Sequence, residues 1–288
     1  MSNKSILVTG GSSGLGHAAA RKLANSGFYV FATVREIHGI FDKMQNIEEL
    51  KIDVTNDQSV KEAFHQIESR QEDYPLWGLV NNAGICIPSP LELLEPAEFR
   101  RQLDTNVVGQ LLVTQAALPL IRSNKGRIIN VTSGLGSIAV PYLGAYSIAQ
   151  FAKMAFTDAL RRELKHSGVS VSVVQPGAIY TPIWEKILAA GQDILNQSVS
   201  EKRKIYAKSF LEFLKVSEEG ARLTMTTEND FAEVVLNALN ADIPATHYYV
   251  GNDAKDFIDK SHTLTAAEID SLFDAHSPTS REFEDYLA

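Results

Sequence analysis

The sequence predicts an α/β fold, a doubly wound sheet of about seven mostly parallel strands with helices on both faces. Short runs rich in β-branched residues alternate with longer stretches that favour helices. The strand runs are also almost continuously apolar, as in strands buried on both faces, and right-handed crossovers would spread the helices over both. The expected strands are Ser5–Thr9, Tyr29–Thr33, Leu50–Ile52, Gly78–Val80, Gly126–Val131, Ser170–Gln175 and His247–Gly251.

The first strand leads into a glycine-rich turn and then into a helix-forming stretch. Glycines at 10, 14 and 16 permit a tight turn, a close approach of a pyrophosphate to backbone amides, and close packing of the helix on its strand. The N-terminus of that helix presents the positive end of its dipole. The turn therefore predicts a dinucleotide site that involves Gly10, Ser12, Ser13, Gly14, Leu15 and Gly16.

The end of the second strand indicates which dinucleotide is preferred. An acidic residue there would bind both adenosine ribose hydroxyls and repel a 2′-phosphate, but Val34 occupies the position and Arg35 follows it. A guanidinium pairs well with a phosphate, and Ser12 adds a hydroxyl. We therefore expect NADP, with NADPH preferred, although NAD remains possible because an exposed arginine is often only solvated.

Four further motifs follow in order: Asn81 to Gly84 after the fourth strand, Asn106 in the next helix, Ser133 with Tyr146, and Pro176 to Thr181. With the glycine turn, these motifs resemble the short-chain dehydrogenase/reductase family over nearly the whole chain. The second strand's end and the long segment after Thr181 are most similar to its 17β-hydroxysteroid and retinol dehydrogenase branch.

The resemblance implies a carbonyl reductase or alcohol dehydrogenase with a Rossmann fold. By motif position, Ser133 orients the carbonyl, Tyr146 moves the proton, and Asn106 holds a water of the proton relay. Tyr146 and the residue four positions later also contact the cofactor. The other residues that the resemblance assigns to the cofactor are Asp53, Val54, Asn82, Ala83, Gly84, Pro176, Gly177, Ile179 and Thr181.

Position 150 departs from the family pattern. The family has a lysine four residues after the tyrosine, where its charge stabilises tyrosinate and its ammonium holds the nicotinamide ribose; this chain has Gln150. An amide can bind the ribose but supplies no charge, so oxidation should suffer more than reduction. Lys153 lies one turn further along the same helix face and either reaches back as a substitute cation or is an ordinary exposed or interface lysine.

Residues 182–228 carry no strand pattern and are expected to form a helical lid inserted into one domain that spans residues 1–288. Packing on the core explains their apolar positions equally well. The last stretch, Leu264–Ala288, is interpreted as a surface helix or a subunit contact. The apolar positions in the lid are Trp184, Ile187, Leu188, Tyr206, Phe210, Phe213 and Leu214.

Composition excludes several classes of protein. A net charge of −8 and a pI near 5.4 argue against nucleic-acid binding. No apolar run is long enough to span a membrane. Seven histidines show no metal-ligand spacing, so no metal is expected. The one cysteine, Cys86, rules out an internal disulfide and, with the polar start, favours the cytoplasm; we interpret it as a buried structural thiol or, less readily, as a residue bordering the active site.

Three functional hypotheses remain. The first is an NADP(H)-dependent carbonyl reductase or alcohol dehydrogenase that acts on a small apolar ketone, aldehyde or secondary-metabolite substrate, with Tyr146 as proton donor. A non-redox cyclase or isomerase that uses Tyr146 as an acid is the second, and a regulatory NADP(H)-binding protein without turnover is the third; Gln150 motivates both. A homodimer or homotetramer is expected, because the family pairs the Tyr146 helix and the preceding helix, here around Glu98–Arg122. Its candidate contact positions are Phe99, Leu103, Val107, Leu111 and Leu112.

Overall fold

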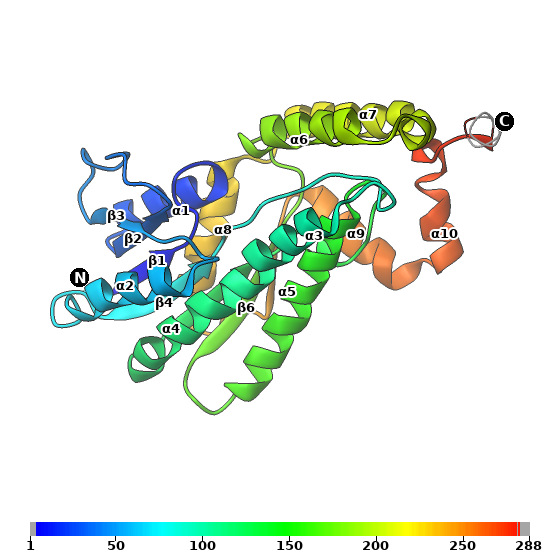
Figure 1. The fold of residues 1–288 in the computed structure, drawn as a ribbon. Helices are drawn as coiled ribbons and strands as arrows, with labels where there is room; N and C mark the ends of the chain where they lie inside the picture. The colour runs from blue at the N-terminus through cyan, green and yellow to red at the C-terminus, as the bar shows by residue number, and fades with distance from the viewer. Residues whose placement is uncertain (1–3, 281, 283–288) are drawn as a thin grey trace.

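The computed structural model describes residues 4–280 and 282, and its centre is one sheet of seven parallel strands. They lie in the order β3-β2-β1-β4-β5-β6-β7, so the winding reverses between β1 and β4 (Figure 1). The predicted doubly wound Rossmann fold is confirmed. The strands are β1 (Ser5–Val8), β2 (Tyr29–Val34), β3 (Ile47–Lys51), β4 (Leu76–Asn81), β5 (Arg127–Val131), β6 (Ser170–Pro176) and β7 (His247–Val250).

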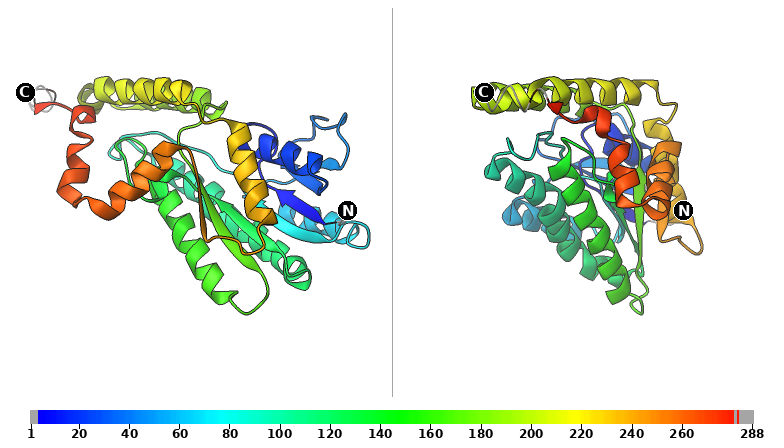
Figure 2. Two further views of the ribbon diagram at one scale, coloured as in Figure 1. Left: turned by 180° about the vertical axis from the view of Figure 1, so that it is seen from behind. Right: turned by 90° about the vertical axis from the view of Figure 1, so that its right-hand side faces the viewer.

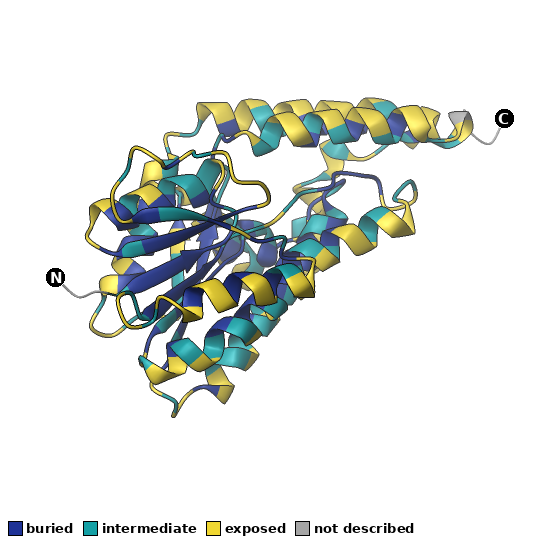
Figure 3. Ribbon diagram, turned by 60° about the vertical axis from the view of Figure 1, so that its left-hand side comes forward, coloured by how far each residue is buried: buried dark blue, intermediate teal, exposed yellow. Residues whose placement is uncertain are grey.

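Helices cover both faces of the sheet because alternate side chains of each strand enter different cores. On β1, Ile6 and Val8 pack into one core and Leu7 into the other. Figure 3 shows the strands buried between helices whose outer faces are exposed. The first core includes residues of α1 (Gly14–Asn25) and α8 (Glu228–Asn240), and the second residues of α2 (Asp57–Glu68), α4 (Gly109–Ser123) and α5 (Gly144–Glu163).

Most strand boundaries differ from the sequence prediction by one or two residues, and two differences are larger. β3 begins at Ile47 rather than Leu50, because an edge strand tolerates polar residues; there the Glu49 carboxylate accepts a hydrogen bond from His38 N at 2.8 Å. The helix expected around Glu98–Arg122 is divided into α3 (Pro96–Leu103), a π-helical turn (Asp104–Val108) and α4. In this turn the Gly109 amide donates a hydrogen bond to the carbonyl of Asp104, five residues earlier in the chain.

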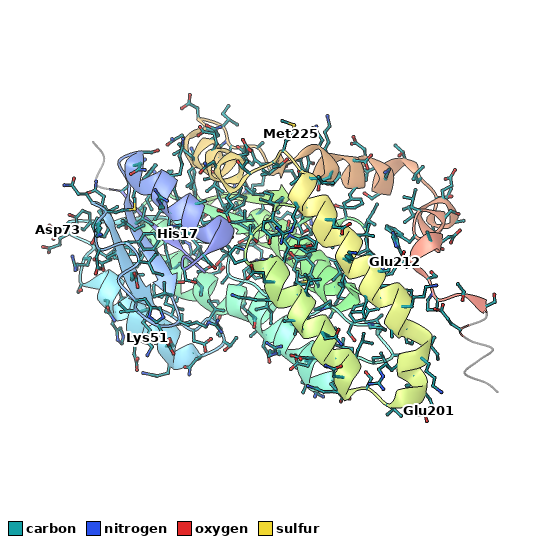
Figure 4. All side chains as sticks on the ribbon, turned by 90° about the horizontal axis from the view of Figure 1, so that it is seen from above. His17, Lys51, Asp73, Glu201, Glu212 and Met225 are labelled. Atoms are coloured by element: carbon teal, nitrogen blue, oxygen red, sulfur yellow. The ribbon has the colours of Figure 1, made fainter. Side chains whose placement is uncertain are left out.

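The strand-free stretch 182–228 contains two helices, α6 (Ile183–Gln197) and α7 (Ser200–Leu223). They lie side by side and project past the sheet (Figures 1 and 2). Figure 4 shows Glu201 at the outer end of this hairpin and Met225 at the end nearer α1 and α8. The helices predicted for this stretch are therefore present.

The C-terminal part crosses the end of the molecule below this hairpin (Figure 2). It consists of α9 (Asn252–Thr263), α10 (Ala266–Ser271) and a 3-10 turn (Asp274–His276); residues 281 and 283–288 of the stretch interpreted as a surface helix or subunit contact lie outside the described part. Within the described residues, no helix is both long and apolar enough to cross a membrane.

Candidate active site

The predicted motifs lie at the carboxyl ends of adjacent strands, where open α/β sheets bind their ligands. Thr9, at the end of β1, fixes the segment after β4, because its hydroxyl oxygen accepts hydrogen bonds from the amides of Asn82 and Ala83, both at 2.9 Å. The Asn82 side chain donates back to the Thr9 carbonyl at 3.0 Å. These hydrogen bonds hold the glycine turn and the Asn81-to-Gly84 motif together.

The glycine turn has the shape that a dinucleotide requires. Gly10 and Gly14 have φ angles of +70° and +57°, which favour glycine. A Cβ on Gly16 would lie 2.2 Å from the carbonyl oxygen of Gly10, so a side chain cannot enter there. Ser12 and Ser13 are exposed on the turn, and Leu15 is partly exposed above the helix N-terminus. The cradle therefore fits a pyrophosphate bound by backbone amides.

At the adenosine end, Arg35 is exposed and has no ion-pair partner among the described residues. Val34 before it is buried at the end of β2. Glu49 holds the next part of this loop by accepting backbone hydrogen bonds from His38, Ile40 and Phe41. Burial raises the pKa of its carboxyl, but these hydrogen bonds outweigh burial and lower the pKa below its usual value. The guanidinium is thus free for an anionic ligand beside an ordered loop.

The predicted adenine pair lies at the end of β3. The Asp53 carboxylate accepts hydrogen bonds from the amide and the hydroxyl of Thr55 at 2.9 and 2.7 Å, which fixes the turn into α2. Val54 is buried, and a Cβ on Gly109 would clash with its side chain. Val54 therefore packs directly against the start of α4. Both residues have structural roles in the described chain, and their cofactor contact stays a prediction.

Asn106 is buried in the π-helical turn and uses its side chain locally. Its Oδ1 accepts from the Ile85 amide at 2.9 Å, and its Nδ2 donates to the Ile85 carbonyl at 3.0 Å. Gly84, the residue before Ile85, is exposed, and a Cβ there would lie 3.4 Å from Asn106 Nδ2. Because both polar atoms of the Asn106 side chain bind Ile85, a water held by Asn106 would bind the backbone of Asn106. That predicted role remains untested.

The structure brings Ser133, Tyr146 and Gln150 together. Ser133 accepts a hydrogen bond from the Leu135 amide at 3.2 Å, which leaves its O–H free to donate. Burial raises the pKa of Tyr146 well above its usual value, and negative charge on Cys86 would raise it further. Hydrogen bonds from Gln150 and Ser133 oppose that shift in part. Tyr146 is therefore held protonated, the state of a proton donor.

Cys86 borders this centre. It is partly buried in an apolar cluster that also contains Tyr146, and burial raises the pKa of its thiol to about 12. The thiol is thus neutral and unreactive near neutral pH. Cys86 packs as a small apolar group, as expected of a structural thiol, and it does so beside Tyr146.

Lys153 is not the ordinary exposed lysine that one sequence interpretation describes. It is 2 % exposed, so it is not a surface lysine, and burial alone lowers the pKa of its ammonium to about 7. The groups that shift the pKa of Tyr146 besides burial are Cys86, Gln150 and Ser133. A role of Lys153 as a substitute cation therefore stays a prediction.

The loop after β6 lies opposite the glycine turn. Pro176 ends the strand, and Thr181 is buried opposite the glycine turn, 3.5 Å from where a Cβ on Gly14 would lie. Ile179 is buried, and its carbonyl accepts from the Trp184 indole at 3.2 Å. These contacts join the predicted loop to the start of α6.

Sequence reasoning missed Asp253, which supports the same loop. Its carboxylate accepts a hydrogen bond from the Ala178 amide at 2.6 Å, and a Cβ on Gly177 would lie 2.0 Å from its Oδ1. Gly177 is thus required by the close approach of a carboxylate. Because Asp253 lies seventy-five residues from Ala178 in the chain, no local pattern indicated the contact.

Sequence reasoning also missed Tyr142, which joins the loop before Tyr146 to two distant segments. Its hydroxyl lies 2.8 Å from Ser209 Oγ on α7 and 2.7 Å from the carbonyl of His276. Its φ of +64° is unusual for a bulky residue. The apolar lid positions pack around this loop, in a cluster with Ile138, Val140, Tyr142, Leu143, Ile187, Leu195, Phe210, Phe213 and Leu214 at its centre.

Comparisons with known proteins show which family the chain resembles. The family model "short chain dehydrogenase" matches residues 4–191. The chain is 69% identical to a 3-amino-tetrahydro-pyrrolizinone reductase of Xenorhabdus hominickii over 99% of both chains. It is 34% identical to retinol dehydrogenase 7 of Mus musculus, covering 89% of this chain and 83% of that one.

Solved structures show the same arrangement. A short chain dehydrogenase from Burkholderia cenocepacia in complex with NADP superposes with a TM-score of 0.72 at 26% identity, covering 94% of this chain and 99% of the other. A short-chain dehydrogenase from Streptomyces avermitilis has a TM-score of 0.76 at 23% identity, covering 94% and 96%, which supports the fold.

Proposed function

Because the chain belongs to the short-chain dehydrogenase/reductase family, we propose that this enzyme is an NADPH-dependent reductase of a 3-amino-tetrahydro-pyrrolizinone or a close analogue. The observation that carries the proposal is the 69% identity to the Xenorhabdus reductase over 99% of both chains. That alignment covers nearly the whole chain, so it includes α6 and α7 as well as the glycine turn. We propose that substrate specificity depends on the two helices and cofactor binding on the glycine turn.

The cofactor preference is supported by the charge at the end of β2. Arg35 has no partner among the described residues, and no acidic side chain occupies position 34 to repel a 2′-phosphate. Ser12 is exposed on the neighbouring turn. When bound, the nicotinamide supplies the hydride, and the glycine cradle holds the pyrophosphate.

The residues around Tyr146 support reduction. A tyrosine whose pKa is raised by burial is protonated near neutral pH, so it can donate a proton to the substrate as the hydride arrives. The free O–H of Ser133 would donate to the same substrate oxygen and orient it. Oxidation would need tyrosinate, which this environment disfavours.

The apolar residues that pack near Tyr146 support a small ring substrate with apolar faces. Leu135, Trp184 and Phe257 belong with Cys86 and Tyr146 to the apolar cluster between the catalytic loop and the helical hairpin. We propose that α6 and α7 act as the lid of this cleft. An apolar wall favours a ring that binds by shape and leaves its polar groups to Ser133 and Tyr146.

Turnover of a synthetic 3-amino-tetrahydro-pyrrolizinone with NADPH tests the proposal, followed by loss of NADPH absorbance and by mass spectrometry of the product. Tyr146→Phe is the matched control, and it should lose at least about a hundredfold in kcat. A retinoid aldehyde and a steroid ketone should be reduced more slowly. Product formed without consumption of NADPH would support an isomerase or cyclase, and cofactor binding without any product would support a regulatory protein; either result would overturn the proposal.

A further inference from the structure

The loop between β2 and β3, residues 35–46, is organised by a carboxylate at the edge of the sheet (Figure 1). Glu49 on β3 accepts hydrogen bonds from three amides of this loop, those of His38 at 2.8 Å, Phe41 at 3.3 Å and Ile40. Both carboxylate oxygens take part. Burial raises the pKa of this carboxyl, but the amide bonds outweigh burial and lower it, so Glu49 is charged near neutral pH. Such charge-assisted bonds are stronger than those between neutral groups.

Phe41 fastens the same loop to α1. Its side chain is 2 % exposed, and its ring stacks on the ring of His17 with 4.8 Å between the centroids and 18° between the planes. His17 lies in the first turn of α1, directly after Gly16 of the glycine turn. A stacked pair of this kind adds to the free energy gained by burial of the rings. The loop is therefore held by β3 and by the helix that begins at the glycine turn.

Arg35 stands where this loop leaves β2, close in the chain to a contact with the glycine turn. Two residues earlier, Thr33 accepts a hydrogen bond from the Gly11 amide through its carbonyl at 2.8 Å and one from the Gly10 amide through its hydroxyl at 3.2 Å. Ser12 is the next residue of that turn. The backbone before Arg35 is thus fixed to the glycine turn, and the backbone after it is fixed by the ordered loop.

We propose that Glu49 is a positioning residue for cofactor choice, which holds the loop 35–46 in the form that presents Arg35 to the 2′-phosphate of NADPH. The inference rests on the proposed use of NADPH and deepens it by adding a residue that acts through Arg35. Ordering a loop and a long side chain at the moment of binding costs affinity. A loop that is ordered before the cofactor arrives reduces this cost for NADPH, whereas NADH has no phosphate to gain from it.

A positioning role and a direct electrostatic effect of Glu49 predict opposite results. A carboxylate near a phosphate repels it, so removal of the charge would then tighten the binding of NADPH. The amides that bind Glu49 counter this repulsion, because each directs a partial positive charge at the carboxylate. The positioning role therefore predicts that NADPH binding weakens when the carboxylate is replaced.

Glu49→Gln tests the role by cofactor binding. Glutamine is nearly isosteric, so the fold should persist, but its NH₂ group would place donors against the amides of the loop. We expect the Kd for NADPH to rise about tenfold and the Kd for NADH to change less than about twofold in fluorescence titrations. Glu48→Gln is the matched control on the same strand and should change neither constant, because Glu48 accepts from the Tyr29 hydroxyl and pairs with Arg70 instead.

The effect should also depend on Arg35. In a chain that already carries Arg35→Ala, Glu49→Gln should raise the Kd for NADPH less than about twofold, because the group that the loop presents is gone. An equal loss of affinity in both backgrounds would overturn the inference, since Glu49 would then act through another part of the site. Unchanged or tighter NADPH binding in Glu49→Gln alone would overturn it as well.

Hydrogen exchange followed by NMR needs neither turnover nor cofactor, so it separates this inference from the proposed function. In the cofactor-free protein, the amides of His38, Ile40 and Phe41 should exchange faster in Glu49→Gln than in the native protein, because their acceptor is weakened. Glu48→Gln should leave their exchange as it is. Unchanged exchange in Glu49→Gln would overturn the inference even if NADPH is confirmed as the cofactor.

The titrations also show where a failure lies. A native protein that binds NADH more tightly than NADPH would overturn the proposed cofactor and this inference together. If the pyrrolizinone is not reduced but the dissociation constants change as expected, the proposed substrate is wrong and the role of Glu49 is supported.

Discussion

At the residue scale, the most consequential position is Gln150, an amide where the family's lysine would stand. Gln150→Lys should raise turnover, most strongly for oxidation near neutral pH, because a nearby ammonium lowers the pKa of Tyr146 and favours tyrosinate. For reduction the gain should be modest, on the order of tenfold. Steady-state kinetics in both directions would measure it. A folded variant that binds cofactor but reduces more slowly than the native enzyme would show that the site was rebuilt around glutamine.

Arg35 carries the prediction on cofactor choice. Arg35→Asp should reverse the preference for NADPH, because the new carboxylate repels a 2′-phosphate and accepts hydrogen bonds from the ribose hydroxyls of NADH. The ratio of the two dissociation constants should change by at least about tenfold, as measured by fluorescence titration. Arg70→Asp, which removes an exposed guanidinium paired with Glu48, is the control and should leave the ratio as it is.

Burial of Lys153 also predicts how stability depends on pH. Burial lowers its pKa from 10.5 to about 7, so between these values the unfolded chain binds a proton that the folded chain does not. The contribution of this residue to the free energy of unfolding should therefore rise with pH across that window, by up to a few kcal/mol. Urea denaturation of native and Lys153→Met proteins would measure it. The difference between them should be largest near pH 7 and shrink toward pH 10, and a constant difference would contradict the assigned burial.

At the element scale, the hydrogen bonds of Tyr142 tie the loop before α5 to α7 and to the C-terminal turn. Tyr142→Phe removes the hydroxyl between Ser209 and the His276 carbonyl, which should cost about 1 kcal/mol of stability. If this contact also holds the helical hairpin over the cleft, KM for the substrate should rise about fivefold with kcat nearly unchanged. Tyr206→Phe is the matched control, because its bond to Glu92 is exposed and should contribute little. Equal effects in both variants would argue against a special role for Tyr142.

The elements also show what a sequence can and cannot predict. Strand positions followed from apolar runs, and the glycine turn followed from spacing, because both are local patterns. The π-helical turn at Asn106 was missed since its sequence looks like ordinary helix, and it arises from side-chain bonds to the distant Ile85. Asp253 and Tyr142 were missed for the same reason, as each acts across at least sixty-seven residues. The burial of Lys153 went unseen because composition patterns place lysines at the surface.

At the scale of the whole molecule, the π-helical turn, α4 and α5 carry large apolar side chains that are exposed. Val108, Leu111, Ile148 and Phe151 are each between 40% and 44% exposed. Of the contact positions predicted from the sequence, Leu111 is one of these, whereas Phe99, Leu103, Val107 and Leu112 are only partly exposed. Helix faces of this kind are commonly covered by a partner, so the expected homodimer or homotetramer stays our prediction.

The combination Ile148→Asp and Phe151→Glu tests that prediction. In a symmetric interface, each new carboxylate would face the carboxylates of the other copy. Burying these charges without a cation would raise the free energy of the assembled state. We therefore expect the native chain to sediment as a dimer or tetramer at micromolar concentration, and the double variant as a folded monomer. Val216→Glu, at an apolar position of α7 that is 48% exposed and away from α4 and α5, should leave the native assembly intact. A native chain that sediments as a monomer would refute the assembly. If instead the double variant stays assembled, α4 and α5 do not form the interface, and their exposed side chains must be explained by another contact.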